Sequence, residues 1–541
     1  MSTVWNTSAL RGVTDATAGF ELDLDGMRLE AAAVERLLTA EPGPKQHNPP
    51  PALCERAHQG MRDIENGAVK NPDEHRRVTH FTDRIAYPES ALFRRVEAFA
   101  ENVRQRCESG RGQPVEAVIV NGIGGSALGP QLLQFACHGP AWNERSPQER
   151  RFYPRLYFLD NTDSAGLADA LAVVRPQTTM VVTISKSGGT QETRNNLVAL
   201  QQAYAAVGEP FARHAVAITQ RGSKLDRQAQ AERWLARFPM AESIGGRTSE
   251  TSIVGHLPAA LTGIPFRELL AGACHMDALT REPDPRRNPA YQLAIAWYLA
   301  GHGRGDRNMV VVPYADRLVL LSRYLQQLVM ESLGKARDLD GRLVFQGLNV
   351  FGNKGGTDAH AYIQQLNDGR DDFFVTFIEI LRDPLQADVD DGLTMGDYLH
   401  AFRQGLANAL TAKGRQVINL TLEELTPFSL GLIIALYERA VAYYAELIGI
   451  NAFHQPGVEA YKKASGAVNA LNRKAQAWIA GVSRSWSGTA NAAAEALGEP
   501  AAATELAGIL AKFAVNRRTF NGRAIQRQWQ DDAWMFTVKR A

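Results

Sequence analysis

Short apolar runs alternate with helix-forming segments in the first half of the chain. The runs are rich in β-branched residues and end in polar or glycine residues: VEAVIVNG (115–122), RLYFLDN (155–161), TMVVTISKSGG (179–189) and HAVAITQ (214–220). Continuous apolar runs between helical segments are typical of strands in a parallel sheet that helices cover on both faces. The pattern therefore predicts an α/β unit in this part of the chain.

The same alternation restarts after residue 300. The predicted strands of this second part are NMVVVPYAD (308–316), NVFGNKGG (349–356), FFVTFIEIL (373–381) and RQVINLTLE (415–423). From residue 425 we expect mostly helix, because the alanine-rich segments there favour it. The predicted fold class is α/β, with two tandem α/β/α sandwich domains on parallel sheets and helical N- and C-terminal extensions.

A proline-rich stretch over residues 39–53 marks a connector near the N-terminus. We therefore predict an N-terminal extension over residues 1–75, which includes this connector. The two α/β domains are predicted at residues 76–295 and 296–480, and the helical C-terminal extension at residues 481–541.

The overall composition argues against several classes of protein. The 541 residues carry 59 Lys+Arg against 58 Asp+Glu, so no basic field favours nucleic acid. The 4 cysteines form no CxxC pair and no Cys/His cluster, so neither a disulfide framework nor a metal site is predicted. The first residues do not resemble a secretory signal, and Glu438 and Arg439 interrupt the longest apolar stretch. We expect a cytoplasmic protein that binds neither nucleic acid nor a membrane.

The first predicted strand runs into a glycine-rich turn, NGIGGSALGP (121–130). Glycine allows backbone N–H groups to approach an anion, and the start of a helix adds a positive partial charge. The segment also fits the pattern GxGxxG/A, so a dinucleotide site stays open. The acidic residue expected about twenty positions later in such a site is missing. A tight turn without a ligand is the simpler alternative.

The third predicted strand ends in SKSGGTQET (185–193), which combines hydroxyl groups, one lysine and two glycines. Several short donors and one positive charge suit a compact phosphate monoester. The alternative is a Ser/Thr cap that only opens a helix. Because both glycine-containing loops follow strands of one α/β unit, we expect them at the same edge of the sheet, where ligands bind.

The segment QQLVMESLGKARD (326–338) is predicted to be helical from its apolar spacing. Glu331 lies in its middle, one turn after Gln327 and one turn before Lys335. The simplest interpretation is a solvent-facing ion pair between Glu331 and Lys335. A sheltered carboxylate that acts as a general base is the functional alternative.

Several segments resemble motifs of the glucose-6-phosphate isomerase (phosphoglucose isomerase) family, which has tandem sugar-isomerase domains. They occur in the family's order and span residues 115–465. The similar segments are GIGGSALGP (the glycine turn), SKSGGTQET (the phosphate loop), ESIGGRTS at 242–249 (the first signature), MESLGK (around the catalytic glutamate), GGTDAH at 355–360 (around the catalytic histidine) and FHQPGVEAYK at 453–462 (the second signature).

The resemblance implies a role for each matched residue. Glu331 would move a proton between C1 and C2 of the substrate, and Arg247 would stabilise the enediolate. His360 and Lys462 would assist ring opening, and Gln327 would orient the sugar. The residues that would hold the phosphate and the neighbouring hydroxyls are Gly125, Ser126, Ser185, Lys186, Ser187, Thr190 and, close by, Gln455.

The implied reaction is the reversible isomerisation of glucose 6-phosphate to fructose 6-phosphate through ring opening and a cis-enediolate, in glycolysis and gluconeogenesis. It needs no cofactor and no metal. In the family the histidine enters the site from the partner subunit, so the resemblance also implies a homodimer in which His360 crosses the interface. The alternatives are a sugar-phosphate sensor, an NAD-dependent dehydrogenase built on the glycine turn, and an isomerase that also accepts mannose 6-phosphate.

Overall fold

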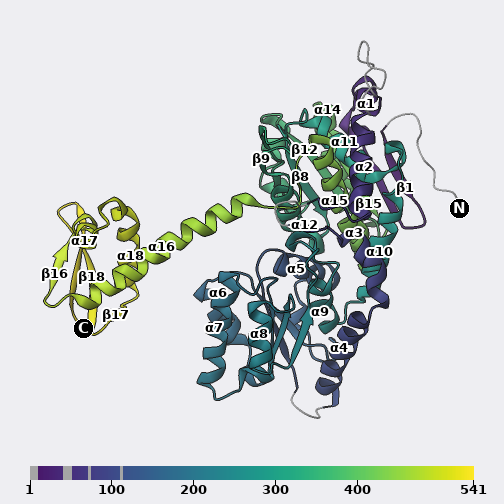
Figure 1. The fold of residues 1–541 in the computed structure, drawn as a ribbon. Helices are drawn as coiled ribbons and strands as arrows, with labels where there is room; N and C mark the ends of the chain where they lie inside the picture. The colour runs from purple at the N-terminus through teal and green to yellow at the C-terminus, as the bar shows by residue number, and fades with distance from the viewer. Residues whose placement is uncertain (1–9, 40–51, 71–74, 110–113) are drawn as a thin grey trace. The chain divides into compact units, whose positions relative to one another are not determined.

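The protein is described by a computed structural model that covers residues 10–39, 52–70, 75–109 and 114–541 (Figure 1). Most of the predicted proline-rich connector lies outside the described residues. The chain divides into two units, residues 1–454 and 455–541, each of which is described by itself. The division lies before the predicted boundary at residue 480, which coincides instead with the end of one long helix, α16 (Pro456–Gly481).

The first half of the described chain forms a five-stranded parallel sheet in the order β4-β3-β5-β6-β7. The strands are β3 (Ala117–Asn121), β4 (Arg155–Leu159), β5 (Thr179–Ile184), β6 (Ala215–Thr219) and β7 (Ala236–Pro239). β3, β5 and β6 are buried along their whole length, as their uninterrupted apolar sequence predicts. The strands predicted between residues 115 and 220 are confirmed, and β7 is an addition.

Helices cover both faces of this first sheet (Figure 1). Apolar side chains of α4 (Ala91–Ser109) and α9 (Ile253–Leu261) pack on one face. The opposite face is covered by α6 (Ser164–Val173), α7 (Gln191–Ala206) and α8 (Lys224–Ala231). The predicted three-layer sandwich is confirmed for this part of the chain.

The second sheet has the order β1-β2-β15-β12-β8-β11. Its parallel strands are β8 (Asn308–Tyr314), β11 (Val350–Phe351), β12 (Phe373–Ile380) and β15 (Gln416–Leu422), which confirms the prediction for the region after residue 300. Two antiparallel strands near the N-terminus, β1 (Gly12–Asp15) and β2 (Phe20–Asp23), extend the sheet beside β15. The predicted helical N-terminal extension therefore contains helices but also two strands that the prediction did not include.

Helices again cover both faces of the second sheet. One face packs against α13 (Ile363–Asp368) and α14 (Met395–Ala412). The other face packs into the largest apolar core, which the following helices build: α1 (Ala31–Leu38), α2 (Leu53–Glu65), α3 (His80–Ala86), α5 (Gly125–His138), α10 (Phe266–Leu279), α11 (Pro289–Ala300), α12 (Leu321–Leu325) and α15 (Pro427–Ile448). Two short hairpins complete this unit, β9 (Lys335–Arg337) with β10 (Leu343–Gln346) and β13 (Asp388–Asp390) with β14 (Leu393–Thr394).

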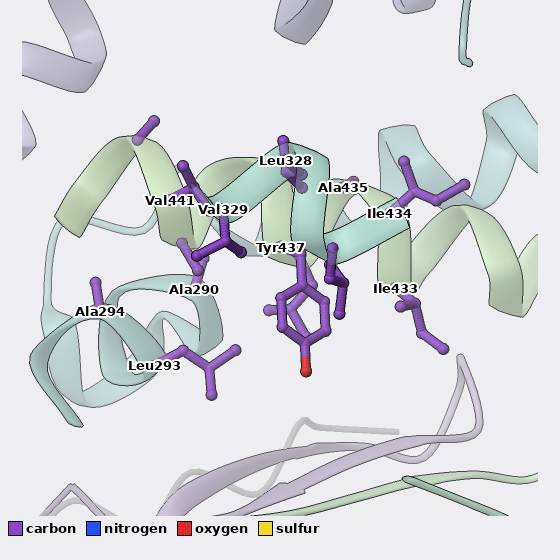
Figure 2. Packing of buried hydrophobic residues seen from close by; sticks show 14 of the residues in the cluster. Ala290, Leu293, Ala294, Leu328, Val329, Ile433, Ile434, Ala435, Tyr437 and Val441 are labelled. Carbon is purple, nitrogen blue, oxygen red and sulfur yellow. The ribbon is translucent and has the colours of Figure 1, made fainter. Parts of the chain in front are cut away.

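The turn that follows α12 is anchored in this core. Leu328 and Val329 are buried and lie among side chains of α11 and α15, including Leu293 and Tyr437 (Figure 2). Burying an aliphatic side chain of this size contributes about 1.5–3 kcal/mol. The helix segment that ends at Glu331 is therefore held rigidly from its apolar side.

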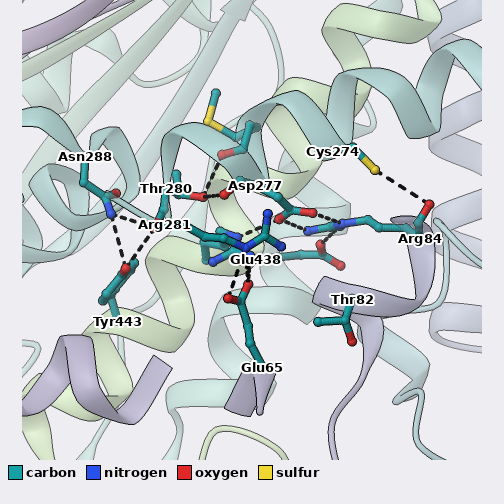
Figure 3. Close-up of polar contacts among 12 residues, drawn as sticks. Glu65, Thr82, Arg84, Cys274, Asp277, Thr280, Arg281, Asn288, Glu438 and Tyr443 are labelled. Carbon is teal, nitrogen blue, oxygen red and sulfur yellow. Dashed lines mark hydrogen bonds and ion pairs between the residues drawn. The ribbon is translucent and has the colours of Figure 1, made fainter. Parts of the chain in front are cut away.

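Charged side chains are buried inside the same core (Figure 3). Arg84 donates two hydrogen bonds to the carboxylate of Asp277, both at 2.6 Å, and a third to Glu438 at 2.5 Å. Arg439 pairs with Asp277 at 2.6 Å and also with Glu65. Burial opposes ionisation of Asp277, but the guanidinium groups of Arg84 and Arg439 hold its pKa below the usual value. The charges that interrupt the apolar α15 sequence are thus paired across helices.

The second unit combines helices with strands. Its helices are α16, α17 (Ala490–Ala496) and α18 (Ala503–Val515), and its antiparallel sheet has the order β16-β19-β18-β17, with β16 (Trp486–Gly488), β17 (Thr519–Phe520), β18 (Arg523–Gln530) and β19 (Ala533–Arg540). Asp531 and Asp532, both with positive φ, form the two-residue turn between β18 and β19. The prediction of a helical C-terminal extension is therefore wrong.

Candidate active site

The glycine turn after β3 packs directly on the segment that carries Arg247. A Cβ on Gly125 would lie 1.7 Å from the carbonyl oxygen of Gly246, so only glycine fits there. The preceding Gly124 has a φ of 58°, and a Cβ on it would lie 2.9 Å from the amide nitrogen of Gln327. Ser126 lies half-buried in the first turn of α5. The structure thus brings the glycine turn, Arg247 and Gln327 together.

Arg247 is buried and faces the carboxylate of Glu331. Its Nη1 lies 3.4 Å from Glu331 Oε2, and the two side chains are 7% and 23% exposed. Its Nε donates to Ser332 Oγ at 2.8 Å and its Nη2 to the carbonyl oxygen of Ala452 at 2.6 Å. Because these bonds fix the guanidinium plane, the cation is preorganised beside the carboxylate.

Gln327 completes the surroundings of the glutamate. Its Nε2 donates to Glu331 Oε2 at 3.2 Å, the oxygen that Arg247 also approaches. The backbone between the two residues is a π-helical turn, η10 (Gln326–Glu331), which continues α12. Single π-helical turns inside helices are frequent at functional sites.

The helix predicted for residues 326–338 is shorter in the structure. It ends at Leu333, and Lys335 begins strand β9. Lys335 is 4% exposed and donates to the carbonyl oxygens of Glu331 and Ser332 at 2.8 and 2.7 Å. Burial, together with the nearby guanidinium of Arg247, lowers the pKa of Lys335 to about 7. A solvent-facing pair of Glu331 and Lys335 is therefore excluded.

The loop of residues 185–190, which we call the phosphate loop, is held in shape by its own hydroxyl groups. The side chains of Ser185 and Thr190 are hydrogen-bonded at 3.1 Å, and Ser185 Oγ accepts the Gly188 N–H at 3.1 Å. Ser187 Oγ accepts the N–H of Gly189 at 3.1 Å. Thr190 precedes α7, but its side chain makes no capping hydrogen bond to the helix. A simple Ser/Thr cap does not describe this loop.

Lys186 links the phosphate loop to residues 242–250, which carry Arg247 and which we call the arginine segment. Its Nζ donates to the carbonyl oxygens of Glu242 and Ile244 at 2.5 and 3.0 Å, a few residues before Arg247. The positive charge of Lys186 is thus held against the backbone that leads to Arg247, the partner of Glu331. The arrangement suits a ligand with an anionic end and a reacting carbon some atoms away.

Two cavities open onto the phosphate loop. One, of about 540 Å³, is lined by Ser185 and Thr190 and by the cationic side chains of Arg194 and Lys224. The other, of about 940 Å³, reaches the loop at Ser187. Three of the predicted phosphate-binding residues, Ser185, Ser187 and Thr190, therefore border open space that an anion can enter.

Three further predicted residues, His360, Gln455 and Lys462, come from segments that follow the glutamate in the chain. His360 ends the short helix η11 (Thr357–His360), and its side chain is exposed. The neighbouring Asp358 is buried and accepts the N–H of Asn353 at 2.8 Å, which fixes the turn. Gln455 and Lys462 lie at the start of α16, in the second unit, and their relation to the glutamate stays a prediction.

Sequence reasoning missed two polar residues near this site. Lys335 was considered only as the surface partner of Glu331 in the simplest interpretation, although it belongs to the MESLGK motif. Glu250, three residues after Arg247, is 1% exposed and was not singled out. Its position inside the segment that carries the first signature was the only signal available for it.

The fold and the site together define a protein of the sugar-isomerase class: two α/β sheets built mainly of parallel strands, a hydroxyl-rich loop after β5, and a glutamate paired with an arginine. Residues 61–485 match the model of the phosphoglucose isomerase family, so the chain belongs to that family.

Individual relatives agree with this assignment. The chain is 48% identical to a glucose-6-phosphate isomerase of Geobacter sulfurreducens over 472 residues, which are 83% of this chain and 85% of the relative. It is 47% identical to one from a Cyanothece species over 84% of each chain. Among solved structures, a glucose-6-phosphate isomerase from Chlamydia trachomatis is 26% identical with a TM-score of 0.72, covering 85% of this chain and 90% of its own.

Proposed function

We propose that this protein is a glucose-6-phosphate isomerase that interconverts glucose 6-phosphate and fructose 6-phosphate, in glycolysis and gluconeogenesis. The observation that carries the proposal is the Arg247–Glu331 pair, linked through Lys186 to a hydroxyl-rich loop. The names of the relatives at 47–48% identity support the same reaction.

The proposed chemistry is a proton transfer between adjacent carbons. Glu331 takes the proton from C1 or C2 of the open-chain sugar and returns it to the other carbon, which contributes about 10²–10⁴-fold. Arg247 stabilises the enediolate that forms in between, because its charge is fixed and partly desolvated. Gln327 orients the carboxylate and the sugar, while the phosphate loop and the glycine turn hold the phosphate and hydroxyl groups. This reaction requires neither a metal nor a redox cofactor.

Ring opening is a separate step in the proposal, since the substrate is mostly cyclic in water. It needs a proton donor for the ring oxygen and an acceptor for the anomeric hydroxyl, and His360 and Lys462 are assigned to these roles. The exposed position of His360 supports its contribution to the site of a partner subunit in a homodimer. We place the protein in the cytoplasm; among the described residues no helix is long and apolar enough to cross a membrane.

A coupled assay tests the proposed function. Purified protein is given fructose 6-phosphate, and the glucose 6-phosphate formed is measured with a dehydrogenase, with and without a chelator. We expect turnover that the chelator does not change. Absence of turnover, or strict dependence on an added metal or NAD in the isomerisation itself, would refute the proposal.

Mixing inactive variants tests the shared site. Homodimers of Glu331→Gln and of His360→Ala are each expected to turn over fructose 6-phosphate far more slowly than the wild type. After subunit exchange, every mixed dimer would hold one site with both residues intact and one with both replaced, so part of the activity should return. No recovery despite exchange proven by mass spectrometry would contradict the contribution of His360 across the interface.

A further inference from the structure

Glu250 connects the segment that carries Arg247 with the segment that carries Glu331. It lies three residues after Arg247, and its Oε1 accepts a hydrogen bond from the hydroxyl of Tyr324 at 2.7 Å. Tyr324 belongs to α12, the helix that leads into the turn with Gln327 and Glu331. This hydrogen bond therefore connects the arginine segment to α12, which leads to Glu331. The connection is buried, since Glu250 is only 1% exposed.

The helix after the glycine turn also rests on this residue. A Cβ on Gly129 of α5 would lie 2.7 Å from the Cβ of Glu250. α5 begins at Gly125, which contacts Gly246 in turn. Three elements of the candidate site, α5, the arginine segment and α12, thus meet at one buried side chain.

A second buried carboxyl group, that of Glu438 on α15, lies within hydrogen-bonding reach of Glu250. Glu438 is 2% exposed, and its Oε2 accepts a hydrogen bond from Arg84 at 2.5 Å. The other oxygens of the pair, Glu250 Oε2 and Glu438 Oε1, have no further partner among the described residues. Two ionised carboxylates in this position would repel each other and leave both oxygens unsatisfied. A single proton shared between these two oxygens gives each of them a hydrogen-bond partner and removes one negative charge.

The surrounding charges assign that proton to Glu250. Arg84 faces Glu438 and favours its ionised form, while Asp277 neutralises the other side of Arg84. Tyr324, which faces Glu250, is a neutral donor. Burial and the charge of Glu438 raise the pKa of Glu250 well above its usual value. Burial also raises the pKa of Glu438, and Arg84 opposes that shift.

We propose that Glu250 is a positioning residue for the isomerisation: as a neutral carboxylic acid it donates its proton to Glu438, accepts the Tyr324 hydroxyl, and holds Arg247 in register with Glu331. The inference rests on the proposed function of the site. Because the phosphate loop is not part of this network, loss of Glu250 should reduce kcat much more than it changes KM.

Three variants test whether Glu250 acts as a neutral acid, as an ionised carboxylate, or only by filling space in the core. Glu250→Gln keeps a neutral donor and an acceptor, so kcat should stay within about threefold of wild type, while Glu250→Leu should lower kcat by about 10–100-fold, as misplaced catalytic groups do. Tyr324→Phe should cause a smaller loss in the same direction. The control is Tyr444→Phe, which removes a buried hydroxyl with no partner among the described residues and should leave kcat unchanged.

An infrared measurement tests the protonation without using activity. The wild type should show the C=O stretch of a buried, protonated carboxylic acid, and Glu250→Gln should lose it. A missing band, a Glu250→Gln variant as impaired as Glu250→Leu, or a folded Glu250→Leu variant with wild-type kcat would overturn the inference. Failure of the isomerase assay in the wild type would instead refute the proposed function, and the band could still be read.

Discussion

Arg247 Nη1 lies 3.4 Å from Oε2 of Glu331, while the rest of the guanidinium is bonded to Ser332 and the backbone of Ala452. In an enediolate mechanism the glutamate loses its negative charge as it takes the proton, and the substrate oxygen gains one. In the proposed mechanism the Arg247 cation pairs with the glutamate before the proton transfer and with the enediolate oxygen after it. No large reorganisation of charge is then needed at the moment of proton transfer.

Replacing Glu331, the proposed base, should stop the reaction but leave substrate binding intact. Glu331→Gln keeps the size of the side chain and a hydrogen-bonding group for Arg247 and Gln327, but an amide cannot accept the substrate proton. We expect kcat to fall by at least about 10²–10⁴-fold. Binding of fructose 6-phosphate, measured by calorimetry, should persist because the phosphate loop is untouched. The surface variant Glu89→Gln is the control, and retained turnover in Glu331→Gln would contradict the assignment.

The role of His360 can be separated from that of the base by the choice of substrate. His360→Ala should reduce turnover of fructose 6-phosphate more than turnover of 5-deoxyfructose 6-phosphate, which lacks the hydroxyl that closes the furanose ring. Glu331→Gln should affect both substrates equally, because every substrate needs the proton transfer. The ratio of kcat/KM for the two substrates is the measurement. Equal losses in His360→Ala would argue against a function in ring opening.

Because the glycine turn packs closely on the arginine segment, enlarging Gly125 should displace Arg247 and lower the activity. In Gly125→Ala the added Cβ would lie 1.7 Å from the Gly246 carbonyl oxygen, so the backbone before Arg247 must move. Because a displacement near 1 Å can cost about 100-fold, we expect a kcat loss of that order. Gly166→Ala is the matched control, since nothing lies within 4 Å of a Cβ there. Activity of Gly125→Ala equal to that of the control would disprove the contact.

The strands that the sequence predicts well are those whose residues are buried on both faces. β5 and β12 have almost uninterrupted apolar sequences, and no distant partner is needed to recognise them. β1 and β2 carry only four residues each, and β2 joins the sheet by pairing with β15, hundreds of residues later. A local pattern cannot report such a pairing.

The site shows the same difference between local and distant information. The loops around Gly125 and Ser185 carry their chemistry in consecutive residues, so the sequence indicates them directly. The π-helical turn that ends at Glu331 packs Leu328 and Val329 against helices far away in the sequence, and no local pattern indicates that turn. The burial of Lys335 likewise follows from tertiary packing, because its sequence position alone favours an exposed partner for the glutamate.

Lys335 makes the stability of the fold depend on pH. Its pKa is about 7 in the folded protein and 10.5 ordinarily, so between these values the unfolded chain binds a proton that the folded chain does not. The free energy of unfolding should therefore rise with pH across this window, by up to about 1.4 kcal/mol per pH unit from this residue.

Lys335→Met removes the titrating amine and keeps an unbranched, buried side chain. We expect the variant to be less stable than wild type at pH 9, where the folded amine is neutral, because the carbonyl oxygens of Glu331 and Ser332 lose their donor. The difference should widen from pH 7 to pH 9, since only the wild type gains from losing a proton on folding. Urea unfolding at several pH values measures it. Parallel stability curves would mean that the lysine stays charged in the folded protein, with its charge balanced by the carboxylate of Glu331.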